Sequence, residues 1–465
     1  MPNSALPPRS RAAARPKRRL LAIVLAAGKG TRLPGSRPKV LVECLGEPLL
    51  EHVRRAVVAV RPEETVILVG HGREAVEAWC ASHWSKAKPV VQEPQNGTGH
   101  AVRVALLAVP HFLGDVVVVC GDVPQLEAAD LSGLLVAHRA SGAAASVLVG
   151  RADDPGHLGR VLRGEGGRLA RIVEAQDATP AERLVREFNT GVYAFDAAAL
   201  RAAVVALPTR NAQGEEYLTD AVGALAAAGR VEAVAARDGG ALLGVNSPSD
   251  LATAHDRLRR REIERHMAAG VQILDPATTI VESDVEIAPG ARILPFTLVG
   301  HGCRIGADCI VGPFAHLRGG TILKAGALIG NFVEVKASTL GEGAKAKHLT
   351  YLGDADVGAA ANIGCGTITA NFDGVKKHRT KVGARARIGS GTVLVAPVTV
   401  GEGAVTGANA VVLAGRNVPA GRTAVGVPAR TLGPKSPAIS RAEGPRPKAA
   451  PSKRTKSTRR KGRSR

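Results

Sequence analysis

The sequence predicts a protein in two parts: an α/β domain with a mostly parallel, Rossmann-like sheet, followed by a parallel β-helix built from hexapeptide repeats. In the first half, apolar runs at 66–69, 116–120 and 144–149 alternate with helical stretches such as 49–60. This alternation is typical of strands that pair in parallel and are covered by helices. In the second half, aliphatic residues recur at every sixth position, which predicts the β-helix.

The six-residue period is unbroken over ten successive positions. They are Val281, Ile287, Ile293, Val299, Ile305, Val311, Leu317, Leu323, Ile329 and Val335. An α-helix repeats at 3.6 residues and a strand at 2, so neither accounts for this period. In a hexapeptide β-helix, each six-residue side of a triangular coil sends one aliphatic residue inward, and these residues stack from coil to coil.

The period also predicts how far the β-helix extends. After a slip of one residue it returns at Leu340, stops between Asn371 and Lys381, and resumes at Val382. We therefore expect a β-helix over 271–430, with an ejected loop where the period stops. About eight coils would stand about 40 Å tall at the ~4.8 Å spacing of strands. Before it, paired charges without Gly or Pro predict a helix over 251–267.

The positive charge of the chain lies at its ends. Lys and Arg number 62 against 41 Asp and Glu, a net charge of +21 that could indicate nucleic-acid binding. Residues 1–19 hold six cations and no acid, and residues 435–465 hold twelve cations and one acid, so the rest has 44 cations against 40 acids. We expect disordered basic segments at 1–19 and 431–465. Nucleic-acid binding by these segments is an alternative that we do not favour.

Cysteine spacing and hydropathy bear on the location of the protein. The six cysteines show no C-x-x-C spacing, so neither a zinc site nor a disulfide framework is indicated. No stretch approaches the roughly 20 apolar residues that span a bilayer. We therefore expect no membrane segment and a reduced, cytoplasmic location.

A glycine loop follows the first expected strand, at 20–26. Its small residues let backbone N–H groups approach a phosphate or a base edge, and Arg32 adds positive charge. The loop matches neither G-x-G-x-x-G nor G-x-x-x-x-G-K-[ST], which weakens the dinucleotide and P-loop interpretations. Gly28, Gly97 and Asp122 each follow an apolar run, so we expect them at the carboxyl ends of strands, where ligands bind.

Several motifs carry a resemblance to a known family. LAAGKGTR at 25–32, with PKVL at 38–41, resembles the signature of sugar-1-phosphate nucleotidylyltransferases. Further matching blocks are GTGHA at 97–101, GDVP at 121–124, NTG at 189–191 and GVN at 244–246. Together with the hexapeptide repeats, residues 20–430 resemble the bacterial bifunctional N-acetylglucosamine-1-phosphate uridylyltransferases and glucosamine-1-phosphate acetyltransferases.

The resemblance implies three parts and two activities. The parts are a nucleotidyltransferase (pyrophosphorylase) domain at 20–247, a linker helix at 248–270 and a left-handed β-helix acetyltransferase domain at 271–430. The enzyme would acetylate glucosamine 1-phosphate with acetyl-CoA. It would then transfer UMP from UTP to N-acetylglucosamine 1-phosphate and release pyrophosphate. The product, UDP-N-acetylglucosamine, serves cell-wall synthesis, and the family is expected to form a homotrimer through the β-helix.

The first site brings two anionic substrates together, so it needs cations and geometry more than covalent chemistry. By the resemblance, Asp122 and Asn246 hold Mg²⁺, Lys39 neutralises the α-phosphate, and Arg32 holds the β- and γ-phosphates. The resemblance also implies a set of residues that bind UDP-N-acetylglucosamine. They are Leu25, Ala26, Ala27, Gly28, Lys39, Gln92, Gly97, Thr98, Gly159, Glu174, Asn189 and Asn246.

The second site needs a base for the amine, a donor for the oxyanion and cations for the sugar phosphate. By the resemblance His348 is the base, and we expect Glu334 to hold its imidazole. The expected contacts of glucosamine 1-phosphate are Arg318, Lys336, Tyr351, Asn362 and Lys377, and those of acetyl-CoA are Cys365, Asn371, Phe372, Ser390 and Ala408. The sequence departs from the family pattern at Phe372, where Tyr is usual, and at Gly426, where Arg is often found.

Two alternatives remain open at this stage. One is a related enzyme of the same architecture that uses a different sugar or nucleotide. The other is a regulatory scaffold with the same two-part build and no catalysis.

Overall fold

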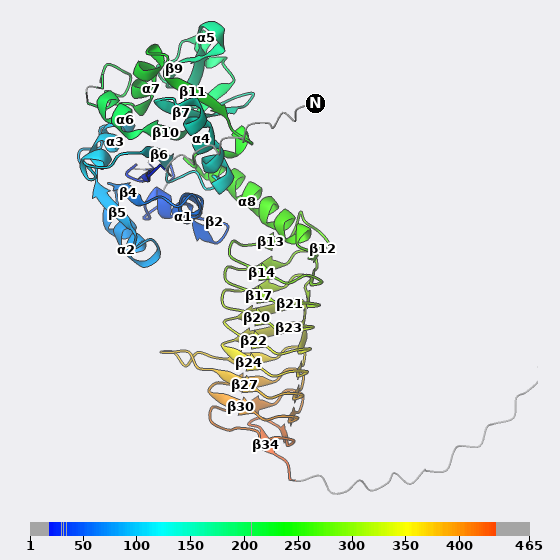
Figure 1. Ribbon diagram of the computed structural model, residues 1–465. Helices are drawn as coiled ribbons and strands as arrows, with labels where there is room; N and C mark the ends of the chain where they lie inside the picture. The colour runs from blue at the N-terminus through cyan, green and yellow to red at the C-terminus, as the bar shows by residue number, and fades with distance from the viewer. Residues whose placement is uncertain (1–17, 29, 31, 34, 206, 434–465) are drawn as a thin grey trace, which may run out of the picture.

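The computed structural model describes residues 18–433 except 29, 31, 34 and 206. The basic segments expected at 1–19 and 431–465, and any nucleic-acid binding by them, lie almost wholly outside the described residues. The described chain forms an N-terminal α/β domain, one long helix and a tall β-helix (Figure 1). Among its helices, none is both long enough and apolar enough to cross a membrane.

The N-terminal domain is built on a mixed sheet with strand order β11-β7-β10-β6-β1-β4-β5. The strands are β1 (Leu20–Leu25), β4 (Glu64–Val69), β5 (Ala87–Val91), β6 (Asp115–Cys120), β7 (Ala145–Arg151), β10 (Glu187–Asp196) and β11 (Val231–Ala235), with β8 (Arg160–Arg163) and β9 (Leu169–Val173) as a side hairpin. Only β10 runs antiparallel to its neighbours on this path. The carboxyl ends of β1, β4 and β6 therefore share one edge, as the predicted fold class requires.

Helices cover both faces of this sheet, which explains why its central strands β1, β4 and β6 are largely apolar and buried. They are α1 (Leu49–Ala59), α2 (Arg73–His83), α3 (Thr98–Leu107), α4 (Ala128–Ser141), α5 (Pro180–Arg183), α6 (Ala197–Ala203) and α7 (Leu218–Ala227), with 3-10 helices η1 (Lys39–Leu41), η2 (Glu165–Gly167) and η3 (Gly239–Ala241). Leu21 and Ile23 of β1 pack with α3, α6 and α7, whereas Ala22 and Val24 pack with α1, α2 and α4.

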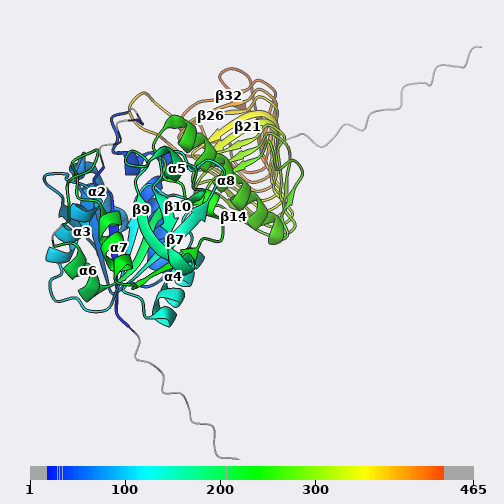
Figure 2. The ribbon, with the colours of Figure 1, turned by 90° about the horizontal axis from the view of Figure 1, so that it is seen from above.

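The long helix α8 (Pro248–Ala268) joins the two domains and lies between them in Figure 2. The Ser247 hydroxyl caps its first turn by accepting from the Asp250 N–H, and Pro248 occupies the first helical position. Leu258 packs with Leu45, which lies between β2 (Glu43–Cys44) and β3 (Glu47–Pro48), and with Leu49, the first residue of α1. Ile263 packs in the core of the β-helix. Helix α8 is thus fixed to both domains.

The β-helix consists of three columns of short parallel strands. The first column is β12 (Gln272–Ile273), β15 (Arg292–Ile293), β18 (Ile310–Val311), β21 (Leu328–Lys336), β23 (Lys345–Gly353), β25 (Asn362–Ile363), β28 (Arg387–Ile388), β31 (Val405–Thr406) and β33 (Thr423–Val425), and β34 (Arg430–Thr431) ends it by pairing antiparallel with β33. The second is β13 (Ile280–Val281), β16 (Leu298–Val299) and β19 (His316–Leu317), then β21 and β23 again, then β26 (Ile368–Ala370), β29 (Val393–Val395) and β32 (Val411–Val412). The third is β14 (Glu286–Ile287), β17 (Arg304–Ile305), β20 (Ile322–Leu323), β22 (Thr339–Leu340), β24 (Ala355–Val357), β27 (Thr380–Val382) and β30 (Val398–Val400).

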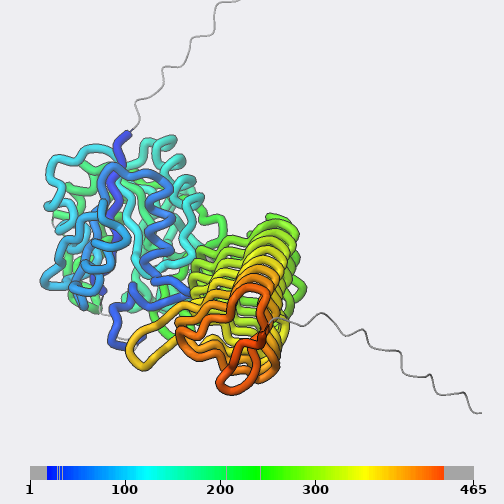
Figure 3. Tube along the Cα trace, turned by 90° about the horizontal axis from the view of Figure 1, so that it is seen from below, coloured from blue at the N-terminus to red at the C-terminus, as the bar shows by residue number. Residues whose placement is uncertain are grey.

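The aliphatic residue at every sixth position points into the core. All ten positions of the unbroken run are buried, from Val281 to Val335. Ile293 pairs with Val311, which is three six-residue sides later, so one coil takes three sides. The loop between β26 and β27 projects from the stacked coils (Figure 3). This architecture confirms the predicted fold class.

Candidate functional site

Three predicted residues of the first site converge at the carboxyl edge of the N-terminal sheet. Asp122 follows β6, Lys39 begins η1, and Asn246 lies shortly before α8. The Lys39 ammonium donates to the Asp122 carboxylate and, at 2.9 Å, to Asn246 Oδ1. The side-chain oxygens of Asp122 and Asn246, from distant parts of the chain, therefore point at one position, which the Lys39 ammonium occupies.

This convergence bears on the expected Mg²⁺. Carboxylate and amide oxygens are ligands that Mg²⁺ accepts, and it commonly uses few protein groups with phosphate oxygens and water. Because the Asp122 and Asn246 oxygens already share the Lys39 ammonium, they are close enough to bind one Mg²⁺ together.

A cavity of about 510 Å³ opens beside this cluster. Its walls include most of the residues expected at the nucleotide, namely Leu25, Ala26, Ala27, Gly28, Arg32, Lys39, Gln92, Gly97, Thr98 and Asp122. The Gln92 amide donates from Nε2 to the Gly97 carbonyl at 2.9 Å, which fixes the orientation of its side chain. Gln95, Gln213 and Glu215 also line the cavity, and we had not predicted a role for them.

The residues expected at the sugar meet around the β8–β9 hairpin and β10. The Gly159 carbonyl accepts from the Asn189 N–H at 2.9 Å. A Cβ at Gly159 would lie 3.3 Å from Glu174 Oε2, so the three residues are neighbours. Burial raises the pKa of Glu174, although Thr219, which donates to Oε1 at 3.0 Å, opposes this shift. Glu174 is therefore a partly buried carboxylate whose one described side-chain hydrogen bond comes from Thr219.

The second predicted cluster lies where strands β21 and β23 pair in parallel. Their register places Asn331 opposite His348 and Glu334 opposite Tyr351. His348 Nδ1 lies 2.9 Å from Asn331 Oδ1, and Glu334 Oε1 accepts from Arg318 Nη1 at 2.9 Å. The prediction that Glu334 holds the imidazole is wrong, because the register puts Glu334 three residues beyond His348 and beside Arg318 instead.

Cations gather beside this cluster. Lys336 lies at the end of β21, and its pKa is lowered chiefly by the neighbouring ammonium of Lys377. A Cβ at Gly353 would touch both the Tyr351 hydroxyl and the Asn371 amide, so these two side chains are adjacent. Arg318, Lys336 and Lys377 are thus neighbours, and Tyr351 lies beside Asn371.

The other predicted contacts of the second site fall into two groups. Asn371 and Phe372 stand at the start of the ejected loop, where Phe372 pairs with Lys377. Cys365 and Ser390 lie on successive turns of one edge, since the Cys365 carbonyl accepts from the Gly391 N–H at 2.7 Å and the Ser390 carbonyl from the Asn409 N–H at 2.7 Å. Ala408 continues that edge. Asn362 lies in β25, beside Lys345 and Arg387, and no described contact joins it to Tyr351.

Sequence reasoning missed the role of Asn331. The signal that could have found it is the coil length: Asn331 precedes His348 by the same interval that separates Val335 from Leu352, so the two lie one above the other. Sequence reasoning also missed His157, whose Nε2 lies 3.2 Å from the Asn246 amide nitrogen.

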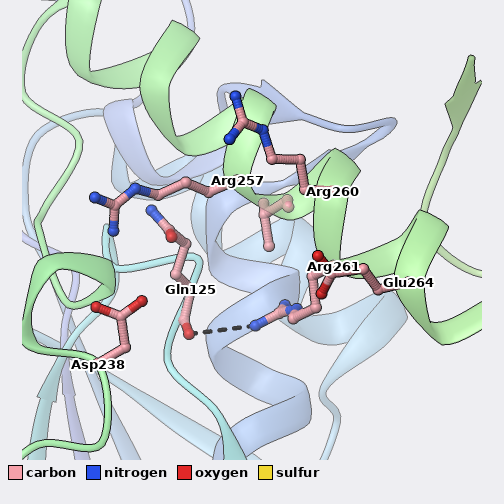
Figure 4. A pocket seen from close by; sticks show the side chains of 7 residues that line it. Gln125, Asp238, Arg257, Arg260, Arg261 and Glu264 are labelled. Carbon is pink, nitrogen blue, oxygen red and sulfur yellow. Dashed lines mark hydrogen bonds between the residues drawn. The ribbon is translucent and has the colours of Figure 1, made fainter. Parts of the chain in front are cut away.

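A smaller cavity of about 240 Å³ lies between α8 and the N-terminal domain, and Figure 4 shows the side chains around it. Arg257, Arg260 and Glu264 come from α8, opposite Gln125 and Asp238. Arg261 donates to the Gln125 carbonyl at 3.4 Å and to Glu127 at 2.8 Å, contacts that fix α8 against the domain. None of the predicted site residues lines this cavity.

Comparisons with known proteins agree with both halves of the structure. Residues 22–192 match the MobA-like NTP transferase domain, and residues 302–337 and 379–414 match the bacterial transferase hexapeptide (six repeats). The Bifunctional protein GlmU of Desulfitobacterium hafniense (strain Y51) is 40% identical over 440 residues, 87% of this chain and 95% of the relative. Those of Pseudarthrobacter chlorophenolicus and Thermobifida fusca are both 43% identical, over 88% of this chain and 90% and 92% of the relatives. The chain therefore belongs to the GlmU family of bifunctional proteins.

Proposed function

We propose that the chain runs its two reactions at the two separate clusters described above. Membership of the GlmU family confirms the resemblance, and the chain is a bifunctional enzyme of UDP-N-acetylglucosamine synthesis. It acetylates glucosamine 1-phosphate and then joins the acetylated sugar phosphate to UMP. The observation that supports this division is that Lys39, Asp122 and Asn246 meet on the α/β domain, whereas Asn331 and His348 meet on the β-helix.

At the first site, Asp122 and Asn246 would hold Mg²⁺, which when bound supplies positive charge to phosphate oxygens. Lys39 then contributes its ammonium to the α-phosphate as the sugar phosphate attacks and pyrophosphate leaves. Arg32, exposed in the cavity wall, is placed to bind the outer phosphates of UTP. These side chains neutralise and orient anions, which is the main requirement of phosphoryl and nucleotidyl transfer.

Uracil and sugar are recognised by polar groups of fixed orientation. The Gln92 Nε2 donates to the Gly97 carbonyl, so the Gln92 Oε1 remains free to accept a hydrogen bond from the N3–H of uracil. The Glu174 Oε2 faces Gly159 and can accept from a hydroxyl of the N-acetylglucosamine. The Asn189 N–H donates to the Gly159 carbonyl, which places Asn189 beside Gly159 and Glu174 and completes the sugar subsite.

At the second site, His348 acts as the general base. If Nδ1 carries the proton and donates to Asn331 Oδ1, Nε2 is left free to accept a proton from the amine. The amine nitrogen forms a bond to the thioester carbonyl, the C–S bond breaks, and coenzyme A leaves as its thiol after taking up the proton. Arg318, Lys336 and Lys377 bind the phosphate, and the close approach of Lys336 and Lys377 favours a dianion between them.

We further propose acetyl-CoA as the acyl donor, a homotrimer formed through the β-helix, and a cytoplasmic location. The cysteines of the chain are all free, which fits a reducing compartment. A column of stacked aromatic side chains supports association of the β-helix: Phe296, Phe314 and Phe332 are about half exposed. Exposed apolar columns of this kind mark protein interfaces.

The test is to measure both half-reactions in two single variants. His348→Ala should abolish acetylation and leave uridylylation of N-acetylglucosamine 1-phosphate intact. Asp122→Ala should lower the rate of uridylylation by about a hundredfold or more, because it removes a ligand of the catalytic ion. It should leave acetylation intact. Loss of both activities in either folded variant contradicts the division.

A further inference from the structure

The hairpin of the α/β domain formed by β2 (Glu43–Cys44) and β3 (Glu47–Pro48) docks on the first coil of the β-helix. Its two turn residues, Leu45 and Gly46, have φ of +50° and +82°, as a two-residue hairpin turn requires. The Leu45 carbonyl accepts from the Ser283 N–H at 3.1 Å. A Cβ at Gly46 would lie 2.6 Å from Glu282 Oε2, so glycine allows this close approach.

Three side chains with metal-binding atoms meet where the hairpin docks. Glu47 follows the turn, Asp284 follows Ser283 in the first coil, and His301 lies in the next coil. One donor atom of each lies within 4.8 Å of the others. His301 Nδ1 is 3.4 Å from Glu47 Oε1 and 3.2 Å from the Ser283 carbonyl, a contact that it would exchange for the ion. Two ligands at about 2.1 Å from a tetrahedral Zn²⁺ are themselves about 3.4 Å apart. The exposed Asp284 side chain can rotate to complete the set.

Glu47 is an acid in an unusual position. Its side chain is 6% exposed, and its Oε2 is buried without a hydrogen-bond partner among the residues that the structure describes. Its Oε1 accepts from Arg55. A buried carboxylate oxygen without a partner costs free energy of folding, and a bound cation would remove that cost.

The surrounding charges favour a dication. Four carboxylates lie at or beside this cluster: Glu47, Glu51, Glu282 and Asp284. The guanidiniums of Arg54 and Arg55 lie beside them. Both guanidiniums pair with the carboxylates of the α/β domain. In the described part of the chain, the two carboxylates of the β-helix take part in no ion pair, and Glu282 accepts from the His301 N–H at 2.7 Å. The excess of two negative charges matches a divalent cation.

We infer that Glu47, Asp284 and His301 bind one divalent cation, with Zn²⁺ preferred. The imidazole nitrogen selects Zn²⁺ over Mg²⁺, because Mg²⁺ prefers oxygen ligands. The ion would join β3 to the first two coils of the β-helix and so tie the two domains together. None of its three ligands takes part in the two proposed reactions, so the site would be structural.

Zinc retention by the full-length protein tests the site. Protein stripped with EDTA is dialysed against Zn²⁺ in excess Mg²⁺, which competes at Asp122 and Asn246, and the zinc per chain is counted by plasma mass spectrometry. One Zn²⁺ per chain is expected in the natural protein and in Asp122→Asn, which separates this site from the uridylyltransferase site. His301→Asn and Asp284→Asn should weaken binding on the order of tenfold or more.

His378→Asn is the matched control, because His378 also faces a carboxylate, that of Asp373 at 2.6 Å, but has no third ligand beside it among the residues that the structure describes. It should keep the zinc, and circular dichroism verifies that each variant is folded. The site is refuted if the natural protein retains no zinc, if folded His301→Asn and Asp284→Asn retain as much as the natural protein, or if His378→Asn loses as much as they do.

Discussion

The amide of Asn331 fixes the imidazole of His348, while the carboxylate of Glu334 fixes the guanidinium of Arg318. A general base contributes about 10²–10⁴ in rate when it is held in the correct tautomer and orientation. In the proposed function the two residues would therefore support different steps, Asn331 the proton transfer and Glu334 the binding of the sugar phosphate.

Kinetics should separate these roles. Asn331→Ala is expected to lower kcat of acetylation roughly ten- to a hundredfold, part of the full contribution of the base, with a small change in KM for glucosamine 1-phosphate. Glu334→Gln is expected to raise that KM because it releases Arg318. Steady-state kinetics of both variants decides between the roles: an effect of Asn331→Ala on KM alone contradicts the assignment.

Glu174 gives the proposed sugar subsite a pH signature. Burial raises its pKa, so the folded protein keeps a proton that the unfolded chain loses near its ordinary pKa of about 4.3. The contribution to the free energy of unfolding is therefore fully present below that pH, and it is lost as pH rises through the raised pKa. At neutral pH the partly desolvated Glu174 carboxylate therefore lowers the free energy of unfolding.

Glu174→Gln should therefore raise Tm at neutral pH, with little change at pH near 4, while KM for N-acetylglucosamine 1-phosphate rises. Thermal melting at the two pH values measures the first effect, and uridylyltransferase kinetics the second. A Tm at neutral pH below that of the natural protein would show that the carboxylate is held by more than the hydrogen bond from Thr219.

At the scale of the element, the hexapeptide period was the most informative part of the sequence. It predicts which side chains enter the core, because every six-residue side sends the residue at the same position inward. It could not predict that β21 and β23 are nine-residue strands that each belong to two columns of the β-helix. Nor does the period alone give the pairing of these two strands after the one-residue slip, in which Asn331 lies opposite His348. That register is what brings Asn331 to His348.

The aromatic column of Phe296, Phe314 and Phe332 is a second property of these elements. Their rings stack at 4.7 and 5.3 Å, yet each remains about half exposed. Phe314→Ser should shift the proposed trimer toward monomer in sedimentation velocity, with little loss of monomer stability because the ring is only partly buried. Leu413→Ser, at another exposed apolar position, is the control. A Phe314→Ser protein that remains as trimeric as the control would remove the column from the interface.

At the scale of the whole molecule, the first site was predictable in part because parallel strands bring their carboxyl ends to one edge. The rule places Gly28, Gly97 and Asp122 together, but not Asn246, which follows Lys39 by 207 residues and reaches it only through the fold. The contact of the β2–β3 hairpin with the β-helix could not be predicted. Glu47, Asp284 and His301 show no spacing along the sequence that joins them.

Mixing two separately purified variants tests the central claim, that one chain carries two independent sites. His348→Ala and Asp122→Ala are supplied together with glucosamine 1-phosphate, acetyl-CoA, UTP and Mg²⁺, and the products are separated by chromatography. Each variant alone should form no UDP-N-acetylglucosamine, and Asp122→Ala alone should accumulate N-acetylglucosamine 1-phosphate. The mixture should form UDP-N-acetylglucosamine, because the intermediate can pass from one protein to the other. A mixture of folded variants that forms none would contradict two independent sites.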